Sequence, residues 1–444
     1  MFEFGRELKR ILGSGLGQGE MDPGLLELFD TFMLQGQARS SDIDAGRVST
    51  RDPFPMWLKS CALWRELARR SGDPVVLRRA AAAAQSALKV SRNEAETARA
   101  NLEQALTTLL GVDLYGDLEL LATTGERLRA VSAMTGDELF EARLEAAWAR
   151  FASREALCGD DHARALEAAA LFDAAIHRLD KLAAHAGLPA ARLEAAVARI
   201  ERADLLAGFG LRRREPRLLR EAVAGLEALR KGLDGDYEPL TWARSAEVLG
   251  SSLAALGELE GRAEPIAEGV SVLSEAGERF TRDHAPLDWA RRSHALGVAL
   301  QALGETLDND DCLDQAAEAF DEAQDLLADS PLAIRATVAS NRAACLARVA
   351  ERHGDLEALA RAEAAFRMEL ELAEPETDPV SWAVLQVNLA RLYEARGELT
   401  GDFSEREAAI YALDAALDIF CERGLKGLAD TAQAGLERAQ VPAL

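Results

Sequence analysis

The sequence is poor in aromatic residues and in basic charge. Aromatic residues make up 5% of the chain, and 51 basic against 75 acidic residues give a formal net charge of −24. Such a charge repels phosphate backbones and anionic membrane surfaces, and few aromatic side chains remain to stack on bases. The composition therefore argues against nucleic acid as a partner.

Cysteine pairs and long apolar runs are also missing. The five cysteines lie far apart without a CxxC pair, so neither a disulfide framework nor a zinc ribbon is expected. No apolar run reaches the roughly 18 residues of a membrane span, and Glu3 and Glu7 interrupt the position of a secretory apolar core. We expect a cytoplasmic protein with no integral membrane segment.

The sequence does contain a repeated unit of about 46 residues. Trp242, Trp289 and Trp382 each follow a proline at the same offset, and Ile334 or Arg335 stands in their place in a fourth copy. Each unit has two apolar stripes at helical spacing with a break between them, which indicates a helical hairpin.

The break between the two helices is a Gly-Asp pair in many copies. Glycine supplies the positive φ that ends one helix, and aspartate caps the amides of the next. The pairs are Gly72-Asp73, Gly116-Asp117, Gly159-Asp160, Gly354-Asp355 and Gly401-Asp402.

With this template the chain divides into four segments. Residues 1–51 form an N-terminal helical segment and linker outside the repeat, and 52–237 form degenerate hairpins. Four clear repeats follow in 238–423, and 424–444 form a C-terminal capping helix, more polar than the others. About eight hairpins plus a cap then account for residues 52–444.

Three stretches of the first segment have individual predictions. Residues 2–12 have an apolar side beside basic residues, which is suited to docking on a membrane surface or a partner; the alternative is a cap over the first hairpin, or disorder. The sequence predicts a helix at residues 25–34 and a loop at residues 36–53.

The repeat unit resembles a tetratricopeptide repeat lengthened from the usual 34 residues to about 46. The resemblance rests on a Leu-Gly pair in the first helix, at Leu249-Gly250 and Leu296-Gly297, and on a small-large-small triplet in the second. The triplet reads Ala316, Phe320 and Ala323 in one unit and Ala409, Leu413 and Ala416 in another. One copy departs from it, because Glu369 replaces the last small residue, and its packing is expected to be weaker.

The resemblance implies an all-α, right-handed superhelical solenoid of antiparallel helical hairpins. In that family the first helices line a concave groove that binds a peptide or helix of a partner. Helical phase around the small contact positions directs a set of first-helix residues toward this groove: Glu247, Ser251, His294, Val298, Ser340, Ala344, Val387 and Arg391. Asn341 and Asn388 match the backbone-binding asparagine of the family, whereas Val248 and Ala295 stand there in the other two units.

Three other patterns give only weak evidence for a catalytic, phosphate-binding or metal site. "DDCLD" at Asp310–Asp314 matches the DDxxD motif of prenyl-diphosphate enzymes, but the two leading acids occupy the capping position of a second helix, and no second acidic site is evident. "GSGLGQG" at Gly13–Gly19 follows no strand and precedes no Lys-Ser/Thr, so it reads as a flexible link. The six histidines have no convincing ligand spacing, so no metal site is expected.

These observations favour a non-enzymatic scaffold or adaptor without a cofactor, which binds a protein or peptide partner in its groove. One alternative is a sensor that takes a peptide or small molecule. The other is a magnesium-dependent helical enzyme that acts on a prenyl diphosphate through the DDCLD acids.

Overall fold

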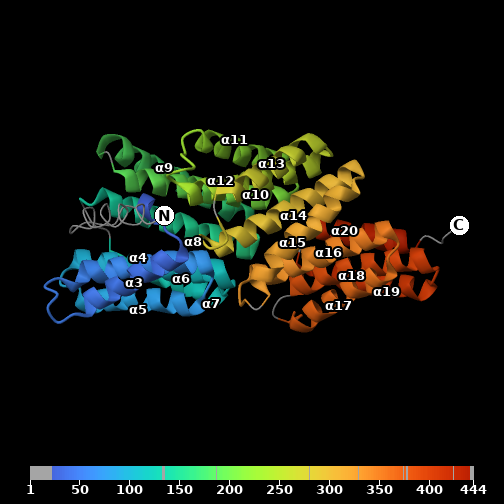
Figure 1. The fold of residues 1–444 in the computed structure, drawn as a ribbon, viewed down its shortest axis with the longest axis horizontal. Coiled ribbons are helices and arrows are strands. Elements are labelled where there is room, and N and C mark those ends of the chain that lie inside the picture. The colour runs from blue at the N-terminus through green and yellow to red at the C-terminus, as the bar shows by residue number, and fades with distance from the viewer. Residues whose placement is uncertain are drawn as a thin grey trace, which may run out of the picture. The chain divides into compact units, whose positions relative to one another are not determined.

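The structure, a computed structural model, describes residues 23–440 except 133–135, 187, 280, 329, 374, 377–378 and 424. Among these residues it contains 19 helices and no strand (Figure 1). The helices are α2 (Pro23–Glu27), α3 (Thr31–Gly46), α4 (Pro53–Ser71), α5 (Pro74–Val90), α6 (Glu94–Tyr115), α7 (Leu118–Arg129), α8 (Glu138–Gly159), α9 (His162–Ala186), α10 (Pro189–Arg213), α11 (Pro216–Arg230), α12 (Pro239–Glu260), α13 (Ala263–Arg279), α14 (Pro286–Leu307), α15 (Asp310–Leu327), α16 (Ile334–His353), α17 (Leu356–Leu372), α18 (Pro379–Thr400), α19 (Phe403–Glu422) and α20 (Lys426–Gln440).

From α4 onward the helices follow one another as hairpins, from α4–α5 to α18–α19, and α20 comes last. Over the described residues the chain is therefore all-α and built from consecutive helical hairpins, as predicted. No described helix is both long and apolar enough to cross a membrane. The four predicted segments and the handedness of the superhelix stay predictions.

Two compact units are built from these helices. Unit 1 comprises Met1–Leu206, Glu221–Val248 and Ala276–Trp289, and unit 2 comprises Ala207–Arg220, Leu249–Glu275 and Ala290–Leu444. Several of the central helices contribute residues to both units.

The turns within the hairpins follow the predicted chemistry at four of the five Gly-Asp pairs. Gly72, for example, has φ 70°, and Asp73 accepts a hydrogen bond from the Val75 amide at 2.7 Å. At Gly159-Asp160 the prediction is wrong by one position, because Asp160 itself has φ 47°. Asp161 then accepts from the Arg164 amide and caps α9. An aspartate tolerates the left-handed conformation better than most residues, so glycine is not required there.

The N-terminal segment differs from the prediction. Helix α3 continues to Gly46 through residues expected to form a loop, and the chain breaks instead at Leu28–Asp30, where Asp30 caps α3. The buried positions of α3 are mostly small, and Asp42 accepts a hydrogen bond at 3.0 Å from the Trp64 indole of α4. A helix held by small residues against a neighbour has too weak an apolar periodicity to be recognised from sequence.

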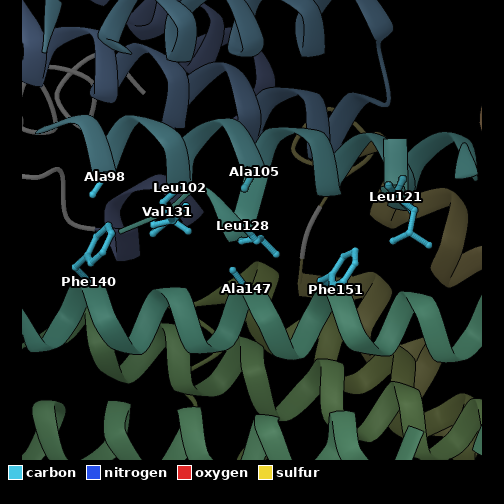
Figure 2. Packing of buried hydrophobic residues seen from close by; sticks show 10 residues of the cluster. Ala98, Leu102, Ala105, Leu121, Leu128, Val131, Phe140, Ala147 and Phe151 are labelled. Carbon is cyan, nitrogen blue, oxygen red and sulfur yellow. The ribbon is translucent and has the colours of Figure 1, made fainter. Parts of the chain in front are cut away.

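The core of unit 1 includes a cluster between α6, α7 and α8. In Figure 2, Phe140 and Phe151 of α8 point away from their own helix into this cluster, which α6 and α7 complete. Leu128 of α7 is 1% exposed in the same cluster. Here the few aromatic residues fill the space that small residues leave between helices.

Close helix contact in unit 2 depends on glycine. A Cβ atom on Gly250 of α12 would lie 2.5 Å from Leu273 Cγ and 2.9 Å from the Gly269 carbonyl oxygen of α13. On Gly297 of α14 it would lie 2.9 Å from the Phe320 ring of α15. The glycine of the Leu-Gly pair therefore lets the second helix of the same hairpin pack closely against the first.

The hairpin α16–α17 differs from the other repeats at two positions that contact each other. Glu369 is buried and accepts hydrogen bonds from the Arg335 guanidinium at 3.0 and 3.2 Å. Arg335 stands where other repeats have tryptophan, and Glu369 stands where they have a small residue. The two departures from the repeat meet in one ion pair, and the weaker packing of this hairpin stays a prediction.

Candidate functional site

The first helices of the repeats in unit 2 leave one side uncovered by their second helices. We call this side the groove stripe: Ser251 on α12, His294 and Val298 on α14, Asn341 on α16, and Asn388 and Arg391 on α18. Ser251, Val298 and Arg391 are exposed, and the other three are partly buried. Neighbouring positions such as Gly297 and Ala343 face the second helices instead.

The two asparagines of the groove stripe hydrogen-bond back to the preceding first helix. Asn341 Nδ2 lies 2.9 Å from His294 Nε2, and Asn388 Nδ2 donates to Ser340 Oγ at 3.1 Å. Each pair is separated by about one repeat length in the sequence. The asparagines therefore connect successive first helices of unit 2.

His294 is neutral in this arrangement. Burial lowers the pKa of its imidazole to about 4. The Asn341 amide nitrogen donates, so His294 Nε2 accepts and its proton is on Nδ1. The ring lies 5.8 Å from the Phe320 ring of α15, so His294 joins a first helix, its second helix and the next repeat.

Acidic side chains lie at the C-terminal end of the first helices. Burial raises the pKa of Glu258 on α12, and the negative charge of Glu305 on α14 raises it further. Burial acts to lower the pKa of Arg348 on α16, but the hydrogen bond and ion pair with Glu351 raise it, and the charge of Glu305 adds to the rise. In unit 2 the groove stripe is therefore polar and uncharged at His294, whereas Glu258 and Glu305 repel each other near the C-terminal ends of α12 and α14.

The structure places all but one of the predicted site residues in unit 2. Ser251, His294, Asn341, Asn388 and Arg391 all lie in unit 2, whereas Glu247 is half-buried and lies in unit 1. Ser340, predicted to face the groove, is 7% exposed and serves as the acceptor for Asn388. The predictions for these residues as partner contacts stay predictions.

The DDCLD residues form the start of α15. The cap is Asn309, which accepts from the Cys312 amide at 3.2 Å, so the prediction that Asp310 and Asp311 are the capping acids is wrong by one position. Asp310 instead pairs with Arg352 at 3.1 Å. Over the part of the chain that the structure describes, no three His, Cys, Asp or Glu side chains gather as metal ligands. Residues 2–12 and the glycine-rich Gly13–Gly19 lie outside the described residues.

Sequence reasoning missed the Glu258–Glu305 pair, although a signal for it was present. The two repeats read "LAALGE" and "LQALGE", and each string ends in one of these glutamates. The same register of the repeat brings them together on neighbouring first helices.

No protein-family model matches the chain, and no curated protein sequence matches it. Among solved structures it is similar to the apo form of RapI, with 11% identity over 88% of this chain and 98% of that chain and a TM-score of 0.44. It is also similar to a Rap protein complexed with Competence and Sporulation Factor, with 10% identity, coverages of 86% and 96% and a TM-score of 0.44. For yeast Tom70 the identity is 11%, the coverages are 93% and 96%, and the TM-score is 0.25.

Proposed function

We propose that the chain is a non-enzymatic adaptor that binds a segment of a partner protein along the groove stripe of unit 2. The observation that carries the proposal is the stripe itself: consecutive first helices bury their other faces and leave Ser251, Val298 and Arg391 exposed in one register. A helix or an extended peptide fits such a repeated, preformed surface.

The charge of unit 2 supports a partner with basic or mixed charge. The exposed face of α15 carries Asp311, Asp314, Glu318 and Asp325, and that of α13 carries Glu264, Glu268 and Glu275. A like-charged acidic partner would be repelled, and a basic one would be attracted. We further propose that the protein acts in the cytoplasm, without a cofactor and without nucleic acid.

The asparagines are poor positions for a test of binding, because their loss also breaks contacts between repeats. Arg391 is a better one, since it is exposed and its replacement leaves those contacts intact. Arg361 on α17 is a matched control, because it is an exposed arginine in the same unit but on a second helix.

The experiment is an affinity pull-down from native cell extract, read by mass spectrometry, with wild type, the double variant Ser251→Arg/Arg391→Glu, and Arg361→Glu. We expect specific partners with wild type and Arg361→Glu, and at least about tenfold less of them with the double variant. The proposal is wrong if wild type recovers nothing above the bead control, or if the double variant recovers the same partners.

A further inference from the structure

A six-residue segment near the N-terminus of unit 1 is bound like a peptide ligand. This segment, residues 26–31, is called the strap. It contacts a surface that we call the strap site: Arg70 of α4, Leu240 and Thr241 at the start of α12, and Asp283 and His284 before α14. All of these residues belong to unit 1.

The carboxylate of Glu27 caps helix α12 from more than 200 positions away in the sequence. Its Oε2 accepts hydrogen bonds from the amides of Leu240 and Thr241, each at 3.1 Å, and its Oε1 accepts one from the Thr241 hydroxyl. Helix N-termini favour an anion, so this pocket is chemically suited to a carboxylate.

Main-chain carbonyl groups of the strap meet buried donors. Arg70 is fully buried and donates to the carbonyl oxygens of Leu26, at 2.7 Å, and of Phe29. His284 Nε2 donates to the Glu27 carbonyl oxygen at 2.6 Å. Contacts of this kind recognise a peptide backbone and do not depend on side-chain identity.

One further hydrogen bond and one buried ring complete the strap. The Thr31 hydroxyl donates to the Asp283 carbonyl oxygen at 2.9 Å, and the Phe29 side chain is 1% exposed. In the bound strap a carboxylate side chain is therefore buried and, two positions later, an aromatic side chain is buried as well.

The strap has little structure of its own. Helix α2 has only five residues, too few to be stable without tertiary contacts. Burial raises the pKa of the Glu27 carboxyl, which reflects the cost of removing it from water. Buried charged groups contribute little net stability, because desolvation offsets their attraction. The strap is therefore held in place by its contacts with the strap site and not by a helix of its own.

We propose that the strap is a detachable segment and that the strap site is a binding site for peptides with an acidic residue followed two positions later by an aromatic one. In the structure the site holds the chain's own residues. When the strap leaves, the same donors are free to take an equivalent segment from another molecule. The proposal concerns a different surface from the groove stripe and does not depend on it.

The test uses the full chain with Glu27→Ala and Thr31→Ala together as the opened variant. The probe is a fluorescent peptide of residues 24–32, GLLELFDTF, and the same peptide with Gln in place of Glu. Glu357→Ala is the matched control chain, since Glu357 is an exposed acid in unit 2.

We expect hydrogen exchange in residues 25–32 and 239–243 to become at least about tenfold faster in the opened variant, and unchanged in Glu357→Ala. The peptide should bind the opened variant at least about tenfold more tightly than wild type, and the Gln peptide should lose most of this gain. Unchanged exchange, equal binding to wild type, or equal binding of both peptides would each overturn the proposal.

If circular dichroism shows that the opened variant is unfolded, Thr31→Ala alone provides the test. It keeps the Glu27 contacts, so faster exchange is then expected at residues 25–32 and 281–285, together with weaker but measurable peptide binding. No change in either measurement would overturn the proposal.

Discussion

The last two hairpins of unit 2 use different chemistry at the same two positions of the repeat. In α18–α19 the positions hold Trp382 and Ala416, which belong to one apolar cluster. In α16–α17 they hold Arg335 and Glu369, joined by a two-fold hydrogen-bonded ion pair. One backbone arrangement therefore accepts either a large ring over a small residue or two long charged side chains, provided that both positions change together.

The largest expected effect comes from placing one half of the ion pair in the apolar hairpin. Trp382→Arg should lower the free energy of unfolding by about 3 kcal/mol or more, because apolar burial is lost and a charge has no partner. Adding Ala416→Glu should recover at least half of that loss. Urea denaturation of the three chains measures it; if the second substitution brings no recovery, the two hairpins are not equivalent.

The reverse exchange is expected to have a smaller effect. Glu369→Ala leaves the Arg335 guanidinium, 21% exposed, without its partner and should cost about 2 kcal/mol. Arg335→Trp added to Glu369→Ala restores the pair of residue types found in α18–α19 and should recover most of the stability. A double variant as unstable as Glu369→Ala in urea denaturation would show that the ion pair is needed by this hairpin.

Of the two hydrogen bonds that join α16 to neighbouring first helices, only the one between Asn341 and His294 should depend on pH. His294 has a pKa near 4 in the fold, below its value in the unfolded chain, so its contribution is complete above about pH 6.5 and is lost as pH falls toward 4. Wild type should lose about 2–3 kcal/mol across this window relative to His294→Gln. Parallel stability curves for the two chains would contradict this. Asn388→Ala, on the other side of α16, should leave the pH dependence unchanged.

The smallest expected effect is the loss of that second link. Asn388→Ala removes one partly buried hydrogen bond to Ser340 and should cost about 1 kcal/mol. Asn341→Ala should cost more, because the Nε2 atom of His294 then loses its donor. Thermal denaturation of both variants at pH 7 orders them, and the opposite order would show that the His294 contact is the weaker link.

Much of the fold could be predicted from local sequence signals. Proline at the first turn, a Gly-Asp pair between helices and apolar spacing at helical period all act within a few residues, so their repetition reveals each hairpin. The predicted helix ends were wrong where either of two neighbouring residues could end or cap the helix. Asp160 takes the conformation assigned to Gly159, and Asn309 caps the helix in place of the acids after it.

The candidate site could be predicted only in part. Helical phase placed Ser251 and Arg391 correctly on an exposed face. It could not show that Asn341 and Asn388 are hydrogen-bonded to the preceding repeat, because the spacing between first helices is set by packing and not by any one helix. The buried Ser340 was misplaced for the same reason.

By itself the sequence determined the type, order and approximate ends of the helices, because these depend on contacts between near neighbours in the chain. Tertiary structure alone decided which distant residues meet: Arg335 with Glu369, His294 with Asn341, and the strap with α4 and α12. Such pairs form only when helices far apart in sequence come within hydrogen-bonding distance, and no local pattern encodes that distance.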